Sequence, residues 1–197
     1  ILGYSNNDLV NAVNQASKNG VNCTLNSPEE VYLAEKLLQL NPFAGGVKFA
    51  KTGAEAMSIA IRIARAYTNK DKVAFSGYHG WSDWYMATNL ARSDNLNNHL
   101  LPGLSTQGVP KGLKNTVVPF IYNSVKDFSK VMKENPDVGV ICIEGARFEY
   151  PTKDFMKAIM KIAKEKGIVI VSDEITSGWR VTDGGVYKIN GFKPDIV

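Results

Sequence analysis

Apolar residues fall into two alternating patterns along the chain. Two short runs, VGVICIE (138–144) and IVIVSDE (168–174), are apolar at almost every position until an acid ends them. Longer segments repeat apolar residues every three or four positions; they are AEAMSIAIRIARAYT (54–68), SVKDFSKVMKEN (124–135) and TKDFMKAIMKIAKEKG (152–167). Strands that are apolar on both faces and alternate with amphipathic helices are typical of a mostly parallel sheet. The pattern therefore predicts an α/β fold in which helices flank a central sheet in three layers, α/β/α.

Shorter signals predict the remaining elements. Residues 6–20 and 27–42 indicate two N-terminal helices, and the second opens with a capping box of Ser27 and Glu30. The stretch 76–115 is rich in Gly, Asn, Ser and Trp and is too long for a simple connection, so we expect it to be functional. Three apolar runs predict strands, the third near a sheet edge because of its proline: VKFA (47–50), KVAF (72–75) and TVVPFI (116–121).

Composition and charge narrow the function classes. The 197 residues are 44% hydrophobic and 21% charged, which is ordinary for one globular domain or a large part of one. The net charge of +4 comes from scattered Lys and Arg residues, so no footprint for nucleic acid or a membrane surface is present in the sequence. No apolar run approaches the roughly 18 residues of a membrane span. Cys23 and Cys142 lack metal-ligand spacing, and we expect two reduced, buried thiols in a cytoplasmic protein without a metal site.

Two adjacent acids, Asp173 and Glu174, end the apolar strand predicted at 168–174. In an open parallel sheet, ligands bind beyond the carboxyl ends of the strands, so both acids lie at the expected ligand edge. A carboxylate that is partly removed from water needs a cation or several hydrogen bonds. The partner is a protein Arg or Lys, a metal or a ligand cation, and the stretch alone leaves a structural salt bridge open.

A second candidate is KTGAEAMSIAIR (51–62), where a predicted strand gives way to a helix. The free N–H groups at a helix start and the positive end of its dipole favour an anion such as phosphate. Gly53 permits a ligand to approach the backbone closely, and Thr52 adds a hydroxyl donor. The segment is neither a Walker loop nor a dinucleotide fingerprint, because it has one glycine and no Gly-Lys-Ser/Thr. An alternative needs no ligand: Thr52 caps the helix, and the charge of Glu55 complements the helix dipole.

A third candidate, SGYHGWSDW (76–84), follows the strand predicted at 72–75 and starts at the same edge. Tyr78 offers a flat face for stacking and His79 a proton carrier, whereas the alternative is a loop whose aromatic residues plug the domain surface. His99 receives no role. One ligand with a phosphate, a flat ring and a ring cation would satisfy all three candidates, and pyridoxal phosphate has these features. A carboxylate at its ring nitrogen keeps that nitrogen protonated, which makes the ring an electron sink for a carbanion.

The motifs TGAEAMSIAIRIARAYT, GYHGWSD and VSDEITSGWRV…GG…GFKPDIV together resemble the large domain of class III aminotransferases, in the fold-type-I pyridoxal-phosphate superfamily. The similarity covers essentially the whole chain and is greatest to the branch that contains glutamate-1-semialdehyde 2,1-aminomutase. The resemblance implies that Glu174 supports the structure. It implies that the main role of Arg180 is a structural ion pair and that its secondary role is a contact with substrate. It also implies a set of cofactor-binding residues: Thr52, Gly53 and Ala54 at the phosphate, Tyr78 stacked on the ring with His79 beside it, Ile175 on the opposite ring face, Asp173 at the pyridinium nitrogen, and Glu144 near the phenolic side. By the same resemblance, the catalytic residues are Asp173, Glu144 and Tyr78.

Three departures from the family pattern matter. Ala54 stands where the family usually has Ser or Thr, which removes one hydroxyl from the phosphate site. Gly145 replaces the usual proline after the strand-end glutamate, so EGARFEYP (144–151) is expected to reshape the pocket wall. The family's Schiff-base lysine follows the KPD segment, and neither Lys188 nor Lys193 matches it. We therefore expect this chain to be an inactive fragment that lacks the usual base for proton transfer.

The sequence thus predicts an N-terminal helical segment, 1–45, and a pyridoxal-phosphate-binding large domain, 46–197, truncated before the lysine and without the C-terminal small domain. The full-length protein is expected to be a homodimer that moves an amino group between a small-molecule amino donor and a carbonyl acceptor, as an aminotransferase or an aminomutase. The alternative is a non-catalytic, truncated or degenerate relative that binds the cofactor or a partner. The missing lysine favours this alternative, and the intact motifs disfavour it. A nucleotide-binding Rossmann-type domain is disfavoured because no glycine-rich fingerprint follows the first strand.

Overall fold

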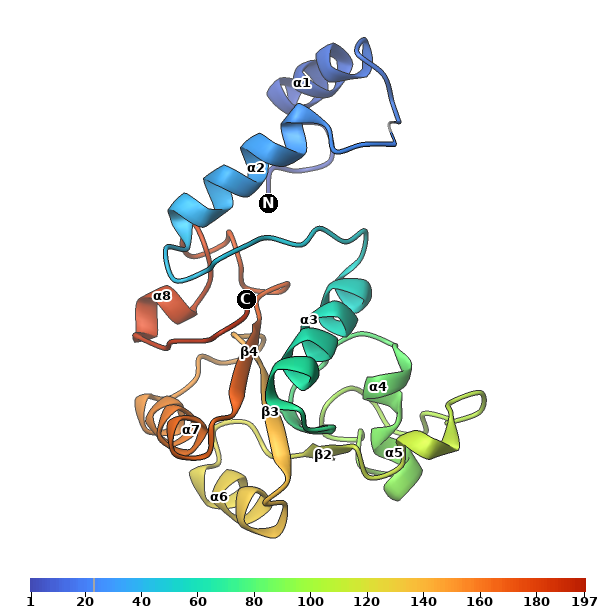
Figure 1. Ribbon diagram of the computed structural model, residues 1–197, viewed down its shortest axis with the longest axis vertical. Coiled ribbons are helices and arrows are strands. Elements are labelled where there is room, and N and C mark those ends of the chain that lie inside the picture. The colour runs from blue at the N-terminus through green and yellow to red at the C-terminus, as the bar shows by residue number, and fades with distance from the viewer. Residues whose placement is uncertain (23) are drawn as a thin grey trace. The chain divides into compact units, whose positions relative to one another are not determined.

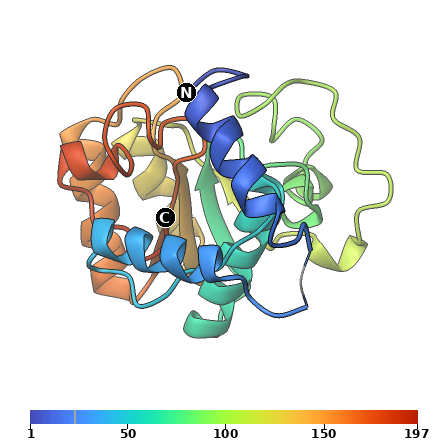
Figure 2. The same cartoon turned by 90° about the horizontal axis from the view of Figure 1, so that it is seen from above.

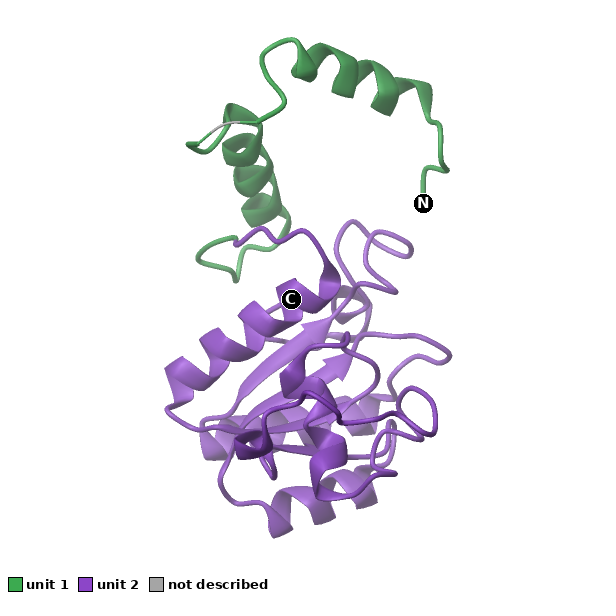
Figure 3. Cartoon of the chain, turned by 90° about the vertical axis from the view of Figure 1, so that its right-hand side faces the viewer, with its two compact units in different colours: residues 1–47 green, residues 48–197 purple. Residues whose placement is uncertain are grey.

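The computed structural model describes residues 1–22 and 24–197, and the prediction for Cys23 lies outside the described residues. The chain forms two compact units, residues 1–47 and residues 48–197 (Figure 3). Within the described residues, no helix is both long enough and apolar enough to cross a membrane. The elements, in chain order, are α1 (Asn7–Ser17), α2 (Pro28–Leu40), α3 (Gly53–Thr68), β1 (Lys72–Ser76), α4 (Asp83–Met86), α5 (Thr88–Ala91), the 3-10 turn η1 (Lys111–Leu113), β2 (Val117–Pro119), α6 (Val125–Glu134), β3 (Val138–Glu144), α7 (Lys153–Lys166), β4 (Val169–Asp173) and α8 (Tyr187–Asn190).

The smaller unit contains the two predicted N-terminal helices, α1 and α2. The capping box at the start of α2 is confirmed: the Ser27 hydroxyl accepts from the N–H of Glu30, and the Glu30 carboxylate accepts from the N–H of Ser27. Pro28 takes the first helical position, where its missing N–H costs nothing. Neither helix contains a buried residue.

The larger unit is built on a sheet with the strand order β2-β1-β3-β4, in which all neighbouring strands are parallel. The chain runs from β1 outward to β2 and then returns to β3 on the other side of β1, so the strand order reverses between β1 and β3. Open α/β sheets bind ligands at this kind of reversal, beyond the carboxyl ends of the strands. The register places Ser76, which ends β1, opposite Ile143, and Glu144, which ends β3, opposite Asp173, which ends β4.

Successive side chains of the strands enter two separate cores, which explains why the strands are apolar on both faces. One face packs against α3 and the other against α6 and α7 (Figures 1 and 2). The predicted three-layer α/β/α arrangement is therefore confirmed. The buried strand residues on the α3 face are Val73, Phe75, Val117, Val140, Cys142, Val169 and Val171, and those on the other face are Ala74, Val138, Ile141, Ile143 and Ile170.

Two of the predicted strands differ in outcome. The strand predicted at 47–50 is wrong: this segment has no regular structure, and Lys48, Phe49 and Ala50 are exposed. A run of four residues forms a strand only where a neighbouring strand accepts its hydrogen bonds, and no strand in the described part of the chain pairs with this segment. By contrast, β2 lies at the sheet edge and ends at Pro119, as predicted.

Apart from Ser76, which ends β1, the regular elements of the long stretch 76–115 are the short helices α4 and α5 and the turn η1. It nevertheless contributes to the core on the α3 face, where Trp84, Tyr85, Met86 and Leu96 are buried. Trp84 and Tyr85 therefore fit the alternative considered from the sequence, in which the aromatic residues of this loop pack against the domain. Tyr78 differs from them, because its ring is only partly buried.

Candidate functional site

The residues selected from the sequence come together at the carboxyl edge of the sheet. Tyr78 and His79 follow β1, Glu144 ends β3, and Asp173 ends β4 with Ile175 two residues later. The two carboxylates at this edge are buried, since Glu144 is 5% exposed and Asp173 is 6% exposed. Two carboxylates in this position require specific partners.

The start of α3 reaches the same group of residues. A Cβ atom added to Gly53 would lie 2.2 Å from Cδ1 of Ile175. A Cβ atom added to Gly80 would lie 2.7 Å from Cβ of Ala54. The loops after β4 and β1 therefore both contact the first turn of α3, and glycine at these two positions permits the close approach.

His79 and Asp173 form a buried pair. His79 Nδ1 lies 2.9 Å from Asp173 Oδ2, and His79 Nε2 lies 3.2 Å from the carbonyl oxygen of Ser76. Both ring nitrogens therefore face acceptors. A neutral imidazole carries only one N–H, so the imidazolium form is the one that satisfies both contacts. The geometry indicates an ion pair between a protonated His79 and an ionised Asp173.

The electrostatic surroundings of His79 agree with that geometry. Burial by itself lowers the pKa of His79, but the neighbouring Cys142 sulfur and the Asp173 carboxylate outweigh it and raise the pKa to about 10. Burial also raises the pKa of the Cys142 thiol. Because a neutral thiol carries no charge, Asp173 is the anion that stabilises the imidazolium near neutral pH.

Asp173 has capacity left for a ligand. Its Oδ1 accepts a hydrogen bond from the N–H of Ile175 at 3.1 Å, while Oδ2 faces His79. A carboxylate offers about four lone-pair directions, and these two contacts use two of them. Asp173 is therefore held in a fixed orientation and still able to accept from a cationic N–H.

Glu144 is held by three contacts from different segments. Its Oε2 accepts from the N–H of Tyr78 at 3.0 Å and lies 3.9 Å from Nη1 of Arg147. Its Oε1 accepts from the hydroxyl of Thr176 at 3.4 Å. The carboxylate thus connects the loop after β1 to the loop after β4, and Gly77 leaves it room, since a Cβ there would lie 2.7 Å from Oε2.

The first turn of α3 is both a capped helix start and a candidate anion site, the two explanations that the sequence left open. Thr52 caps the helix, because its hydroxyl accepts from the N–H of Glu55 at 3.3 Å. The Glu55 carboxylate in turn accepts from the N–H groups of Lys51 and Thr52 at 3.0 and 2.9 Å. Within the described residues, the N–H groups of Gly53 and Ala54 donate to no protein acceptor. Two donors at the positive end of a 16-residue helix therefore remain for an anion.

Tyr78 and Ile175 supply apolar surface beside these polar groups. The Tyr78 ring stands edge-on to Tyr85, with centroids 5.8 Å apart, and the guanidinium of Arg147 lies 5.5 Å from its centroid. Ile175 is 59% exposed although it follows a buried strand end. Ile175 therefore leaves apolar surface available beside the buried carboxylate of Asp173.

Two further predicted residues have structural contacts. The carboxylate of Glu174 accepts from the hydroxyls of Ser172 and Ser177 and from the N–H groups of Val186 and Tyr187. This agrees with its predicted supporting role. No ion pair of Arg180 is found among the described residues, contrary to the prediction; its Nη1 donates instead to the carbonyls of Ile175 and Gly178 at 3.3 and 3.2 Å. The tight turn there exposes backbone acceptors, and a guanidinium satisfies these as well as it does a carboxylate.

Sequence reasoning missed several residues at this edge. His99, to which no role was assigned, accepts from the N–H of Gly77 at 3.3 Å through Nδ1. Arg147 lies close to both Glu144 and Tyr78, and Cys142 lies under His79. The unusual sequence after Glu144 was the signal for Arg147. No spacing in the sequence signalled His99 or Cys142, because their contacts with Gly77 and His79 join segments that are far apart in the chain.

Comparisons with known proteins agree on one family. A family model described as aminotransferase class III matches residues 1–197. The 3-aminobutyryl-CoA aminotransferase of Cloacimonas acidaminovorans is 31% identical over 204 residues, which cover all of this chain and 45% of that protein. The glutamate-1-semialdehyde 2,1-aminomutase of Campylobacter hominis is 34% identical over 203 residues, which cover all of this chain and 44% of that protein. The chain thus spans slightly less than half the length of these curated relatives.

Solved structures show the same fold. A transaminase with pyridoxal phosphate bound aligns with a TM-score of 0.84 at 24% identity, over 98% of this chain and 45% of that chain. An omega-transaminase from Sphaerobacter thermophilus aligns with a TM-score of 0.83 at 23% identity, again over 98% of this chain and 45% of that chain. The predicted fold-type-I architecture is therefore confirmed, as is the resemblance that the motifs carried.

Proposed function

Because the chain belongs to the class III aminotransferase family, we propose that its full-length protein transfers an amino group with the help of pyridoxal phosphate. The reaction is that of an aminotransferase or an aminomutase, between a small-molecule amino donor and a carbonyl acceptor, in a protein that acts as a homodimer. This chain supplies residues that hold the cofactor. The observation that carries the proposal is the buried His79–Asp173 pair, which places a fixed anion at the ligand edge of the sheet.

The phosphate end of the cofactor fits the first turn of α3. The N–H groups of Gly53 and Ala54 have no protein acceptor among the described residues, and the helix dipole favours an anion at this point. Glu55 already satisfies the N–H of Thr52, so the Thr52 hydroxyl proton is the remaining donor of that residue. Ala54 contributes only its backbone, and the phosphate would have one hydroxyl contact fewer than the family usually provides.

The ring end of the cofactor fits the residues after β1 and β4. Pyridoxal phosphate, when bound, supplies an electron sink for the carbanion of an attached amino acid. Asp173 would hold a proton at the ring nitrogen, because an adjacent carboxylate favours the protonated form. His79 orients Asp173 through its imidazolium N–H. Tyr78 and Ile175 would contact the two ring faces and exclude water from them.

Glu144 would act on the phenolic side of the ring. It is fixed by the N–H of Tyr78 and the hydroxyl of Thr176, so its remaining lone pairs point in set directions. A carboxylate there accepts a hydrogen bond from a protonated oxygen of the cofactor and holds that proton in place. Arg147, 3.9 Å away, offsets part of the negative charge of Glu144.

The test uses pyridoxamine phosphate, whose amine does not react with surface lysines as an aldehyde does. Binding to the chain is measured by equilibrium dialysis and by the shift of the ligand's absorbance spectrum. We expect Asp173→Asn to weaken binding by roughly 10–100-fold, since a hydrogen bond to a charged group contributes about 1.5–3 kcal/mol. Asp195→Asn is the control, because the Asp195 carboxylate also accepts a backbone N–H but lies away from these residues.

Unchanged affinity and an unchanged spectrum for Asp173→Asn would refute the assignment. Far-ultraviolet circular dichroism on each variant ensures that a loss of binding is not a loss of fold. Equal weakening of pyridoxamine phosphate binding by Asp195→Asn and Asp173→Asn would also count against the proposal.

A further inference from the structure

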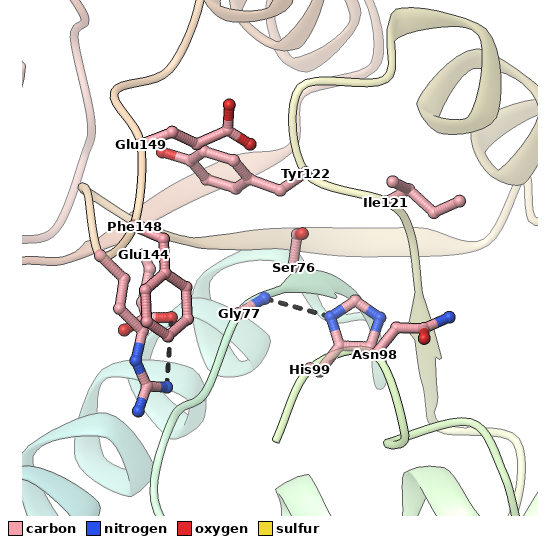
Figure 4. A pocket seen from close by; sticks show the side chains of 10 residues that line it. Ser76, Gly77, Asn98, His99, Ile121, Tyr122, Glu144, Phe148 and Glu149 are labelled. Carbon is pink, nitrogen blue, oxygen red and sulfur yellow. Dashed lines mark hydrogen bonds and ion pairs between the residues drawn. The ribbon is translucent and has the colours of Figure 1, made fainter. Parts of the chain in front are cut away.

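A cavity of about 260 Å³ lies beside the candidate cofactor site (Figure 4). It is bounded by the ends of β1 and β3, by residues 121–122 after β2, and by residues 98–99 and 147–149. It shares Glu144 with the candidate cofactor site and none of the other residues predicted to bind the cofactor. The volume is slightly below the roughly 300–1,000 Å³ of complete small-molecule sites, so it suits a part of a substrate.

Ser76 is the observation that points to a ligand. Its side chain lines the cavity, it is 0% exposed, and its Oγ has no hydrogen-bond partner among the described residues. Figure 4 shows the hydroxyl pointing away from β1, toward the side of the cavity that Tyr122 forms. A buried hydroxyl without a partner destabilises the fold. A ligand that accepts from this hydroxyl and donates to it removes that cost.

His99 adds a donor of fixed orientation. Its Nδ1 accepts from the N–H of Gly77, so the proton of the neutral ring is on Nε2. Burial, together with the charge on His79, lowers the pKa of His99 to about 4, and the ring is therefore neutral near pH 7. Within the described part of the chain, Nε2 has no protein acceptor.

The charges and rings of the lining exclude two classes of ligand. Two carboxylates, those of Glu144 and Glu149, and one guanidinium, that of Arg147, line the cavity, so the excess charge is negative and disfavours an anion. An ammonium group has no acceptor atom, so it would leave the N–H of His99 and the hydroxyl proton of Ser76 unpaired. Tyr122 and Phe148 add aromatic surface for C–H groups, and Phe148, which is 93% exposed, lies at the open side of the cavity.

Taken together, these contacts define what the cavity recognises. We propose that it binds a neutral, hydroxyl-bearing part of the substrate, a sugar or polyol, through Ser76, His99 and the flanking aromatic rings. This inference rests on the proposed amino-transfer function, because it assigns the part of the substrate that lies beyond Glu144. Glu149, whose carboxylate is exposed at the rim, accepts from a ligand hydroxyl.

The experiment is saturation-transfer NMR on the whole chain with three probes: methyl α-D-glucopyranoside, glutarate and 1,5-diaminopentane. We expect transfer to the glucoside and little to the other two. Ser76→Ala should reduce the glucoside signal at least tenfold. Thr88→Val is the matched control, since it removes a buried hydroxyl that does have a partner, the carbonyl of Tyr85 at 2.6 Å.

Thermal unfolding of the two variants separates binding from folding. Ser76→Ala should unfold at the wild-type temperature or above it, because it removes an unpaired buried hydroxyl, whereas Thr88→Val should unfold about 2–4 °C lower and keep the glucoside signal. The proposal is overturned by no transfer to the glucoside, by an equal signal in Ser76→Ala, or by stronger binding of glutarate or diaminopentane. Pyridoxamine phosphate binding by the wild type is measured alongside, so that its failure counts against the proposed function and not against the cavity.

Discussion

The buried pair of His79 and Asp173 predicts a specific dependence of stability on pH. The perturbation is Asp173→Asn, which keeps the shape of the side chain and removes its charge. An asparagine oxygen still accepts from the Nδ1–H of a neutral His79, so the fold persists with an uncharged pair. Removing one partner of a buried ion pair typically destabilises a protein by about 3–5 kcal/mol.

The magnitude follows from the raised pKa of His79. It is about 10 in the folded chain, against 6.5 for an unperturbed histidine, and each unit of pKa corresponds to about 1.4 kcal/mol. The imidazolium therefore contributes at most roughly 5 kcal/mol below pH 6.5, roughly 3 kcal/mol at pH 7.5 and roughly 1 kcal/mol at pH 9, and the share of Asp173 is smaller because Cys142 accounts for part of the raised pKa of His79. Because the folded state binds the extra proton, this stability is fully present below pH 6.5 and is lost as the pH rises through about 10.

The assay is urea unfolding of the wild type and Asp173→Asn at several pH values between 6 and 10. The difference in the free energy of unfolding between the two proteins should be largest at pH 6 and should nearly vanish at pH 10. Asp195→Asn, which removes a carboxylate without a histidine partner, should show a constant difference. A constant difference for Asp173→Asn as well would refute the ion pair, because it would mean that His79 is neutral in the folded chain.

Three other substitutions test single contacts. Gly53→Ala should weaken pyridoxamine phosphate binding about tenfold in a dialysis titration, since a methyl group would occupy the approach to the α3 start, while the flexible end of Ile175 moves aside at little cost in stability. Gly77→Ala should lower the free energy of unfolding by about 2–4 kcal/mol in urea, because φ is +111° and the new Cβ would lie 2.7 Å from Glu144. Glu174→Gln should cost roughly 2–3 kcal/mol in the same assay, because two hydroxyls and two backbone N–H groups lose a charged acceptor.

Each of these three substitutions has a matched control. Gly112→Ala meets open space and should leave pyridoxamine phosphate binding unchanged. Gly167→Ala, at φ +62° with nothing nearby, should cost only about 1–2 kcal/mol, from the left-handed backbone alone. Glu165→Gln removes an exposed carboxylate and should change stability by less than about 1 kcal/mol. A control that equals its test variant would show that the named contact is not the cause.

Local sequence was sufficient for most elements because their signals are contained within them. The apolar strands β3 and β4 and the amphipathic helices α3, α6 and α7 were predictable from periodicity, and the cap of α2 from Ser27 and Glu30. The segment 47–50 shows the limit of such signals. Its pattern matched a strand, but a strand forms only when another strand accepts its hydrogen bonds. The sequence of the segment does not tell whether such a neighbour is present.

The sequence by itself determined the family, the fold class and the residue types at the ends of the strands. The roles of those residues in holding the cofactor stay a prediction. Only the tertiary structure brought His79 to Asp173 across 94 positions, and only it placed Glu144 opposite Asp173 in the strand register. It also decided that His99 accepts from Gly77 and that Ser76 is buried without a partner. The physical reason is that charge, burial and hydrogen bonding depend on neighbours in space, whereas periodicity and capping depend on neighbours in sequence.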